Sequence, residues 1–186
     1  MSVARPNWFV AWPIAPDGWL ERLPPVPARV RRFHPDDLHA TIAFFGAIDE
    51  KAARRGFDAL APFPWVAHDV VLGRVRLMGS PRHGSALAAV LDQGQAPVVE
   101  WMRGARDPVL AAAGARPDER APLPHVTLAR IQRRASRPQR RAAIAWAEEL
   151  DLGAPRVRLG APALYTWSTD RRERLFRIVA ESPLAV

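Results

Sequence analysis

The chain has 186 residues, a net charge of +8 and no cysteine. The missing cysteines exclude disulfides, thiolate catalysis and Cys-based zinc sites, and they fit a reducing cytoplasm. No stretch approaches the roughly 18 to 20 apolar residues of a membrane span, and the N-terminus lacks the pattern of a signal peptide. We therefore expect a cytoplasmic protein without a membrane partner, folded as a single domain over residues 1–186.

Arginine carries almost all of the positive charge, since Lys51 is the one lysine among 27 Lys and Arg residues. Guanidinium groups match the geometry of phosphate, so this excess favours an anionic partner. A GC-rich genome would produce the same excess of Arg over Lys without any selection for binding. The charge alone therefore leaves the partner undecided.

In the first half, apolar runs bounded by Pro, Gly or charged turns predict five elements. They are a strand over 7–12, a short helix over 17–23, a strand over 38–45, a helix over 49–60, and two strands or one bent strand over 65–78. Pro24 stops the short helix, and Asp49 is the expected N-cap of the longer one. Gly73 marks the break in the last segment.

The second half continues the mixture of strands and helices. The expected elements are a loop over 79–85, a strand over 86–91, a helix over 97–113, a strand over 123–131, a helix over 137–150, and closing strands over 163–167 and 175–180. Pro108 is expected to kink or divide the first of these helices. Because both halves mix strands with helices and no linker separates them, we expect an α+β fold with two related lobes facing each other.

Two of the predicted strands carry the same short motif, His-x-Thr followed by a branched aliphatic residue. The copies are His-Ala-Thr-Ile at residues 39–42 and His-Val-Thr-Leu at residues 125–128. Because successive side chains of a strand alternate between faces, the His and the Thr of each copy point the same way. For this composition roughly 0.1 occurrence of His-x-Thr is expected by chance, so a matched pair indicates a shared function.

The residue types of the motif suit phosphoester chemistry. Across one cleft, His39 and His125 can act as acid and base at neutral pH without a metal. Thr41 and Thr127 can hydrogen-bond phosphate oxygens, and Arg130, on the same strand as Thr127, is an apt phosphate clamp. The alternative interpretation is two unrelated core histidines, each with a satisfied hydrogen bond.

The other histidines and the loop arginines are weaker candidates. His34, His68 and His83 have no partner pattern and are expected at the surface, although His34 and His83 could neighbour the cleft. Arg82 and Arg171 lie on loops that could flank it. No residues have the spacing of a zinc site and no Walker-type phosphate loop is present, so we expect neither a metal nor a cofactor.

The motif pair resembles that of the 2H phosphoesterase superfamily, specifically the LigT-like RNA 2′,3′-cyclic phosphodiesterases, also called 2′-5′ RNA ligases. The resemblance extends along the chain in order, to an opening strand at 9–11, the two motifs at 38–46 and 124–130, and closing strands at 164–165 and 176–184. The chain departs from the family pattern at three places: Ala43 stands where a basic residue is common, Trp167 where Ser is usual, and an arginine-rich turn at 171–174 where Gly is frequent.

The resemblance implies two α+β lobes with antiparallel sheets and outer helices, related by a pseudo-twofold axis, with both motifs in a central basic cleft. It also implies a metal-independent phosphodiesterase that opens 2′,3′-cyclic phosphate ends of RNA to 2′-phosphomonoesters. In that reaction His39 is the general acid on the leaving 3′ oxygen and His125 the base on water, while Thr41, Thr127 and Arg130 hold phosphate oxygens. Ligation is the same chemistry with an RNA hydroxyl replacing water. We expect a monomer.

Two alternatives remain open at this stage. One is a phosphodiesterase for a small cyclic nucleotide derivative, which the sequence does not distinguish from an RNA enzyme. The other is a non-catalytic RNA-binding module that kept the cleft, against which the intact motifs argue.

Overall fold

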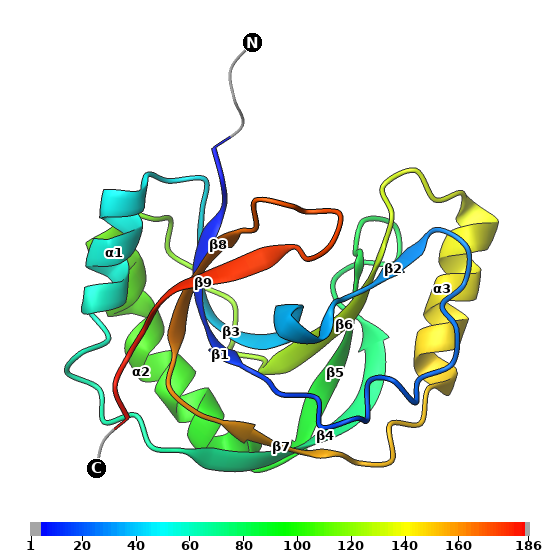
Figure 1. Ribbon diagram of the computed structural model, residues 1–186, viewed down its shortest axis with the longest axis horizontal. Coiled ribbons are helices and arrows are strands. Elements are labelled where there is room, and N and C mark those ends of the chain that lie inside the picture. Colours follow the sequence, from blue (N-terminus) through cyan, green and yellow to red (C-terminus); the bar gives the residue numbers. More distant parts are fainter. Residues whose placement is uncertain (1–4, 185–186) are drawn as a thin grey trace.

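The computed structural model describes residues 5–184, and within this range nine strands form one curled antiparallel sheet (Figure 1). Along the sheet the strand order is β7-β4-β5-β6-β3-β1-β8-β9, and β2 pairs with β6. The strands are β1 (Trp8–Pro13), β2 (Val30–Arg32), β3 (His39–Gly46), β4 (His68–Leu77), β5 (Ala86–Gln93), β6 (His125–Ile131), β7 (Arg156–Leu159), β8 (Ala163–Trp167) and β9 (Phe176–Glu181).

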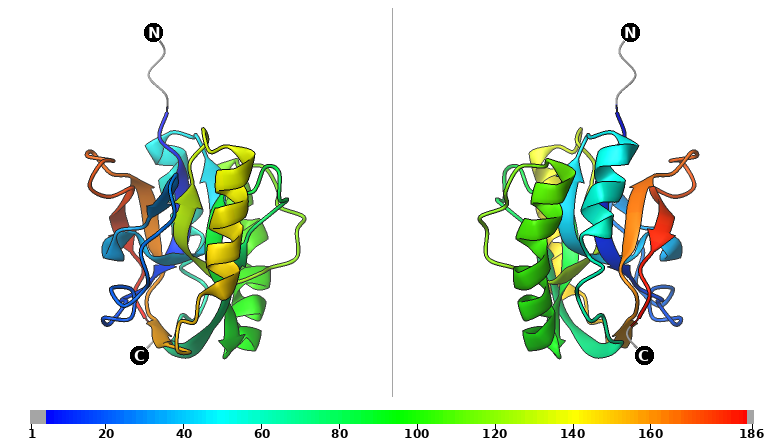
Figure 2. Two further views of the ribbon diagram at one scale, coloured as in Figure 1. Left: turned by 90° about the vertical axis from the view of Figure 1, so that its right-hand side faces the viewer. Right: turned by 90° about the vertical axis from the view of Figure 1, so that its left-hand side faces the viewer.

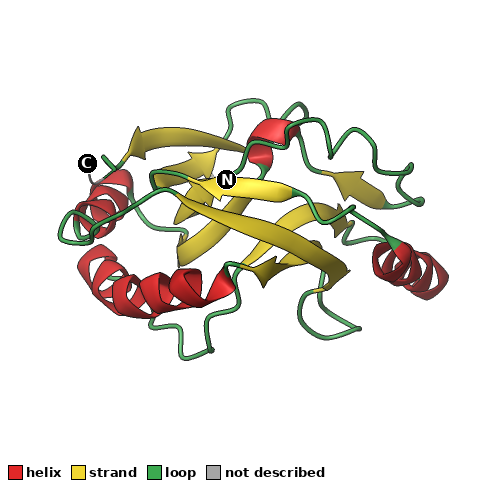
Figure 3. Cartoon of the chain, turned by 90° about the horizontal axis from the view of Figure 1, so that it is seen from below, coloured by secondary structure: helices red, strands yellow, loops and turns green. Residues whose placement is uncertain are grey.

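The helices lie outside the sheet at its two ends (Figures 2 and 3). They are α1 (Glu50–Asp58), α2 (Gln95–Ala113) and α3 (Arg137–Glu149), whereas the short 3-10 helix η1 (Pro35–Asp37) comes directly before β3 near the middle of the molecule. Helices α1 and α2 pack together in one lobe, where α2 also contacts β3, whereas α3 packs on β4 and β5 in the other. The Asp49 carboxylate accepts the Ala52 amide at 2.8 Å and caps α1, as its sequence predicts. This arrangement confirms the predicted α+β fold.

The two lobes meet where β3 lies beside β6, and one residue pair of the ladder, Ala40 with Val126, joins these strands. An antiparallel pair of strands has a local twofold axis between its partners. Here that axis relates position 39 to 125 and position 41 to 127, so it superimposes one His-x-Thr motif on the other. The lobes therefore form a single sheet whose central pair carries both motifs.

A β-bulge follows the threonine in each motif strand. In β3, Ile42 is the extra residue, because the β1 partners Ala11 and Val10 pair with Thr41 and Ala43. In β6, Leu128 is the extra residue, since it is passed over in the pairing with β5. Both aliphatic residues are buried in the main hydrophobic core. The motif's aliphatic position thus marks a bulge, which returns the residue three after the threonine to the motif face.

One predicted helix is absent from the structure, and at two other segments the structure decides between alternatives that the sequence left open. Residues 17–23 form turns instead of a helix, because Asp17 has φ 45° and Gly18 has φ 78°, which no α-helix accommodates. Helix α2 is not divided but runs through Pro108 as one element. The segment expected as two strands or one bent strand is the single strand β4, with an irregular register around Gly73.

A buried carboxylate ties the first motif strand to the hairpin of β8 and β9. Asp37 is fully buried, and its oxygens accept the Leu175 amide at 2.8 and 2.9 Å and the Phe176 amide at 2.9 Å. Asp37 lies two residues before His39, and Phe176 contacts the His39 ring edge-on. This cluster therefore fixes one wall of the space around His39.

We predict that Asp37→Asn lowers the free energy of unfolding by about 2 kcal/mol, because the new amide group places N–H donors against the Leu175 and Phe176 amides. Urea unfolding followed by tryptophan fluorescence measures the change. The control is Asp36→Asn, which removes exposed ion-pair contacts with Arg174 and His34, each worth at most about 1 kcal/mol. Equal losses in the two variants would contradict the anchoring role of Asp37.

Candidate active site

Each motif histidine is held by a carbonyl two residues before it. His39 Nδ1 lies 2.6 Å from the Asp37 carbonyl oxygen, and His125 Nδ1 lies 2.6 Å from that of Leu123. A carbonyl can only accept, so Nδ1–H donates in both rings and fixes the tautomer. Both Nε2 atoms are left for chemistry, the same nitrogen in each ring.

The His39 imidazole is enclosed by aromatic rings. Its centroid lies 4.8 Å from that of Phe9 and 5.4 Å from those of Tyr165 and Phe176. The pKa of His39 is lowered to about 4, mainly by burial and also by the charges of Arg130 and His125, against the opposing effect of the Asp37 carbonyl. The free protein therefore holds a neutral His39 at pH 7.

His125 is half-buried and experiences the same effects more weakly. Burial again lowers its pKa, with additional lowering by the positive charges of Arg76 and Arg120 and a raising effect of the Leu123 carbonyl. An anion bound beside the two rings would favour their charged forms. The pair is therefore arranged to gain a proton when an anion such as a phosphate binds.

A cavity of about 170 Å³ opens at the first motif. His39, Thr41 and Arg130 line it together, whereas His125 and Thr127 lie outside its lining, on the neighbouring strand across the ladder pair. The complete lining is Asn7, Phe9, His39, Thr41, Phe44, Arg130, Trp167, Arg171 and Phe176. Side chains from both lobes thus converge on the space beside His39 Nε2.

Two guanidinium groups give this cavity a positive charge. Arg130 lines it because the Leu128 bulge returns the strand to the motif face. Partial burial and the neighbouring charge of Arg171 lower the pKa of Arg130. Arg171 in turn lies with its Cζ 4.2 Å from the centre of the Trp167 ring. Because the charges of Arg130 and Arg171 repel each other, an anion bound between the two guanidinium groups is favoured.

Sequence reasoning missed the aromatic lining, of which Phe44 is the clearest case. Its side chain is 54% exposed, unusual for a phenylalanine on a central strand. Phe44 follows His39 by five residues, as Arg130 follows His125. Aligning the two motif strands beyond the threonine would therefore have pointed to Phe44 as a candidate site residue. The side chain of Ala43, one of the three departures from the family pattern, is buried in the core and adds no charge to the cavity.

The other histidines lie outside this cavity. His34 is half-buried and its Nδ1 accepts the Asp36 amide at the start of η1. His68 is half-buried and its Nε2 lies 2.9 Å from the Gly94 carbonyl. His83 is exposed on the 79–85 loop. Within residues 5–184, no three His, Asp or Glu side chains are grouped to hold a metal ion, and no helix is long and apolar enough to cross a membrane.

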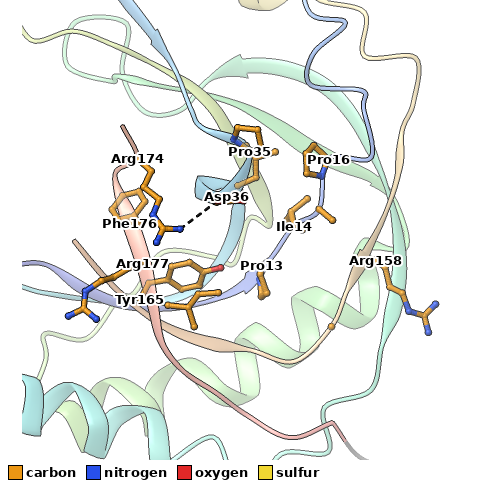
Figure 4. A pocket seen from close by; sticks show the side chains of 14 residues that line it. Pro13, Ile14, Pro16, Pro35, Asp36, Arg158, Tyr165, Arg174, Phe176 and Arg177 are labelled. Atoms are coloured by element: carbon orange, nitrogen blue, oxygen red, sulfur yellow. Dashed lines mark ion pairs between the residues drawn. The ribbon is translucent and has the colours of Figure 1, made fainter. Parts of the chain in front are cut away.

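A larger cavity of about 640 Å³ also borders Tyr165 and Phe176 (Figure 4). An ion pair between Arg174 and Asp36 crosses it at 3.6 Å. Neither motif histidine lines this cavity. The smaller cavity, which His39, Thr41 and Arg130 line, is therefore the candidate active site.

No family model matches the sequence, and no curated protein matches it either. The fold does have matches among solved structures. E. coli LigT complexed with 3′-AMP has a TM-score of 0.69 at 17% identity, over 98% of this chain and 100% of that one. A crystal structure of a phosphoesterase gives 0.68 at 17% identity, over 97% and 99%. A Thermus thermophilus protein gives 0.59 at 16% identity, over 94% and 96%. The chain therefore has the LigT-like fold.

We predict that the pKa of His39 in the free protein is near 4 and that Arg130→Gln raises it, because one nearby positive charge is removed. A pH titration of the imidazole signals by NMR measures both values. As a control, Arg55→Gln removes an exposed charge on α1, outside the cavity. An unchanged pKa in Arg130→Gln would show that this guanidinium does not act on His39.

Proposed function

We propose that the protein is a 2H phosphoesterase that hydrolyses 2′,3′-cyclic phosphate ends of RNA to 2′-phosphomonoesters, as a cytoplasmic monomer. The observation that carries this proposal is the matched pair of histidines, each with Nδ1 held by a carbonyl and Nε2 available. The resemblance in sequence and the LigT-like fold support the same assignment. The solved LigT structures include complexes with 3′-AMP and with phosphate.

In the proposed reaction a water oxygen attacks phosphorus and loses its proton to His125 Nε2. The bond from phosphorus to the 3′ oxygen breaks, and His39 Nε2–H gives its proton to that oxygen. The roles of the two histidines follow the family resemblance. Thr41, Thr127 and Arg130 hold the non-bridging oxygens, where negative charge develops in the transition state.

The lowered pKa of His39 fits this scheme only if the substrate supplies part of the electrostatics. In the free protein His39 is neutral at pH 7 because it is buried. The cyclic diester carries a negative charge, which raises the pKa of a neighbouring imidazole. Binding of the substrate therefore generates the acid that the reaction requires.

A phosphodiesterase for a small cyclic nucleotide remains the second candidate. The observation that favours it is the small cavity of about 170 Å³, which a single phosphate and part of a ribose already fill. Reversible 2′-5′ ligation belongs to the first candidate, since an RNA 5′-hydroxyl would take the place of water.

We predict that His39→Ala and His125→Ala each reduce hydrolysis of 2′,3′-cyclic nucleotides by about 10²- to 10⁴-fold while the protein stays folded. The double variant should be little worse than either single one, because both groups serve one step. His68→Gln, distant from the cavity, serves as the control. Near wild-type activity in either folded single variant would contradict the assignment.

The identity of the product tests the assigned roles. We predict a 2′-phosphomonoester, because His39 protonates only the 3′ oxygen. Phosphorus NMR of the reaction mixture distinguishes the two monoesters. A 3′-phosphate product would mean that His39 and His125 exchange roles.

A further inference from the structure

The candidate cavity is too small for a whole nucleotide. Its volume is about 170 Å³, whereas sites that enclose small ligands range from about 300 to 1,000 Å³. With the reacting phosphate beside His39, the base and the 5′ side of the nucleotide must extend beyond the cavity. The surroundings of the cavity therefore decide what else the substrate contains.

A second hollow, the arginine groove, continues from this cavity and has a volume of about 570 Å³. Arg130, Arg171 and Phe176 line both spaces. Six arginines and no acidic residue line the groove; they are Arg31, Arg82, Arg130, Arg133, Arg140 and Arg171. In the described part of the chain, none of them forms an ion pair with a carboxylate. This concentration of uncompensated charge suits a polyanion.

Two of these arginines hold the walls of the groove in place. Arg31 donates to the carbonyls of Arg171 and Arg172 at 2.8 and 3.0 Å, fixing the turn between β8 and β9. Arg140 donates to the carbonyls of Pro81 and Gly84 at 3.1 and 2.5 Å, fixing the 79–85 loop. Both guanidinium groups line the groove and keep their positive charge, although some of their N–H groups are already hydrogen-bonded to these carbonyls. By contrast, Arg82 and Arg133 are exposed, and their side chains form no hydrogen bond to another side chain within the described residues.

The cavity's other lining is aromatic. Phe44 is exposed there, and Trp167 also lines the cavity, with Arg171 over its ring. Nucleobases stack on such side chains, whichever base is present, because every base has a flat aromatic face. A cyclic-phosphate terminus has a base on one side and a 5′ phosphate on the other. The aromatic lining suits the base, which leaves the arginine groove for the 5′ phosphates.

We propose that the arginine groove binds the phosphates on the 5′ side of the reacting nucleotide, with Arg82 and Arg133 as the residues that favour an RNA strand over a mononucleotide. This inference rests on the proposed function, which it deepens. Neither residue lines the smaller cavity proposed for the reacting phosphate, so their effect should appear only when the substrate has further phosphates.

The test compares two substrates with the same terminal base: a 2′,3′-cyclic mononucleotide and an RNA hexamer ending in a 2′,3′-cyclic phosphate. Wild-type protein should show a higher kcat/KM for the hexamer. Arg82→Gln combined with Arg133→Gln should lower the hexamer value about tenfold and leave the mononucleotide value unchanged. The dependence of the hexamer value on salt should also weaken, by a slope of roughly 0.7 for each phosphate that the variant no longer binds.

A matched control removes the same charge elsewhere. Arg55→Gln combined with Arg116→Gln replaces two exposed arginines that do not line the groove, and both kcat/KM values should stay at the wild-type level. Phe44→Ala should lower both values together, because the terminal base is common to the substrates.

Two results would overturn the inference. Equal kcat/KM values for hexamer and mononucleotide in the wild type, or equal losses in the groove variant, would exclude the groove as a 5′ binding site while leaving the hydrolytic function intact. Failure of the wild type to hydrolyse either substrate would instead overturn the proposed function, and the inference with it.

Discussion

The site depends on one pair of residues in the sheet, Ala40 and Val126, through which the two lobes meet. The local twofold axis at this pair makes the two motifs equivalent, so both histidines lie on one face of neighbouring strands. A bulge after each threonine extends the equivalence, because Ile42 and Leu128 are both the extra residue of their strand. Symmetry ends at the next position on this face, where β3 presents Phe44 and β6 presents Arg130. Two symmetry-related histidines thus border surroundings that are asymmetric, with an aromatic side chain on one strand and a guanidinium on the other, which suits the proposed substrate with a base at one end and phosphates at the other.

In the proposed reaction, burial of His39 makes its role as an acid depend on the bound substrate. His39 lies among three aromatic rings, and the cost of charging it there lowers its pKa to about 4. The positive charge of Arg130 acts in the same direction as burial until an anion binds beside it. The proposed phosphate diester would supply that anion, offset the guanidinium charge and favour the protonated imidazole. In the proposed reaction, the Arg130 charge that helps to keep His39 neutral in the free protein therefore also attracts the anion that would favour its protonation.

The motif strands, the outer helices and the α+β fold could be predicted from the sequence, because apolar periodicity, capping residues and the repeated motif are local signals. The bulges could not, since they depend on which residues of β1 and β5 lie opposite the motif strands. For that reason strict alternation would place Arg130 on the face opposite Thr127, and only the paired sheet explains how it reaches the cavity. The turns at Asp17 and the contact of Asp37 with Leu175, 138 residues away, likewise arise from tertiary structure. Phe44 was predictable from its position relative to Arg130, had the repeat been extended beyond the motif.

The central claim is that two imidazoles with lowered pKa values act as an acid–base pair on one anionic phosphate. The pH dependence of kcat/KM for a 2′,3′-cyclic nucleotide tests it most directly, because this parameter reports ionisations of the free enzyme. One histidine must be neutral and the other protonated, and the pKa values of both lie below 6.5 in the free protein. The account predicts a bell-shaped profile with its maximum below pH 6.5. A kcat/KM that is constant from pH 5 to pH 8 would contradict it.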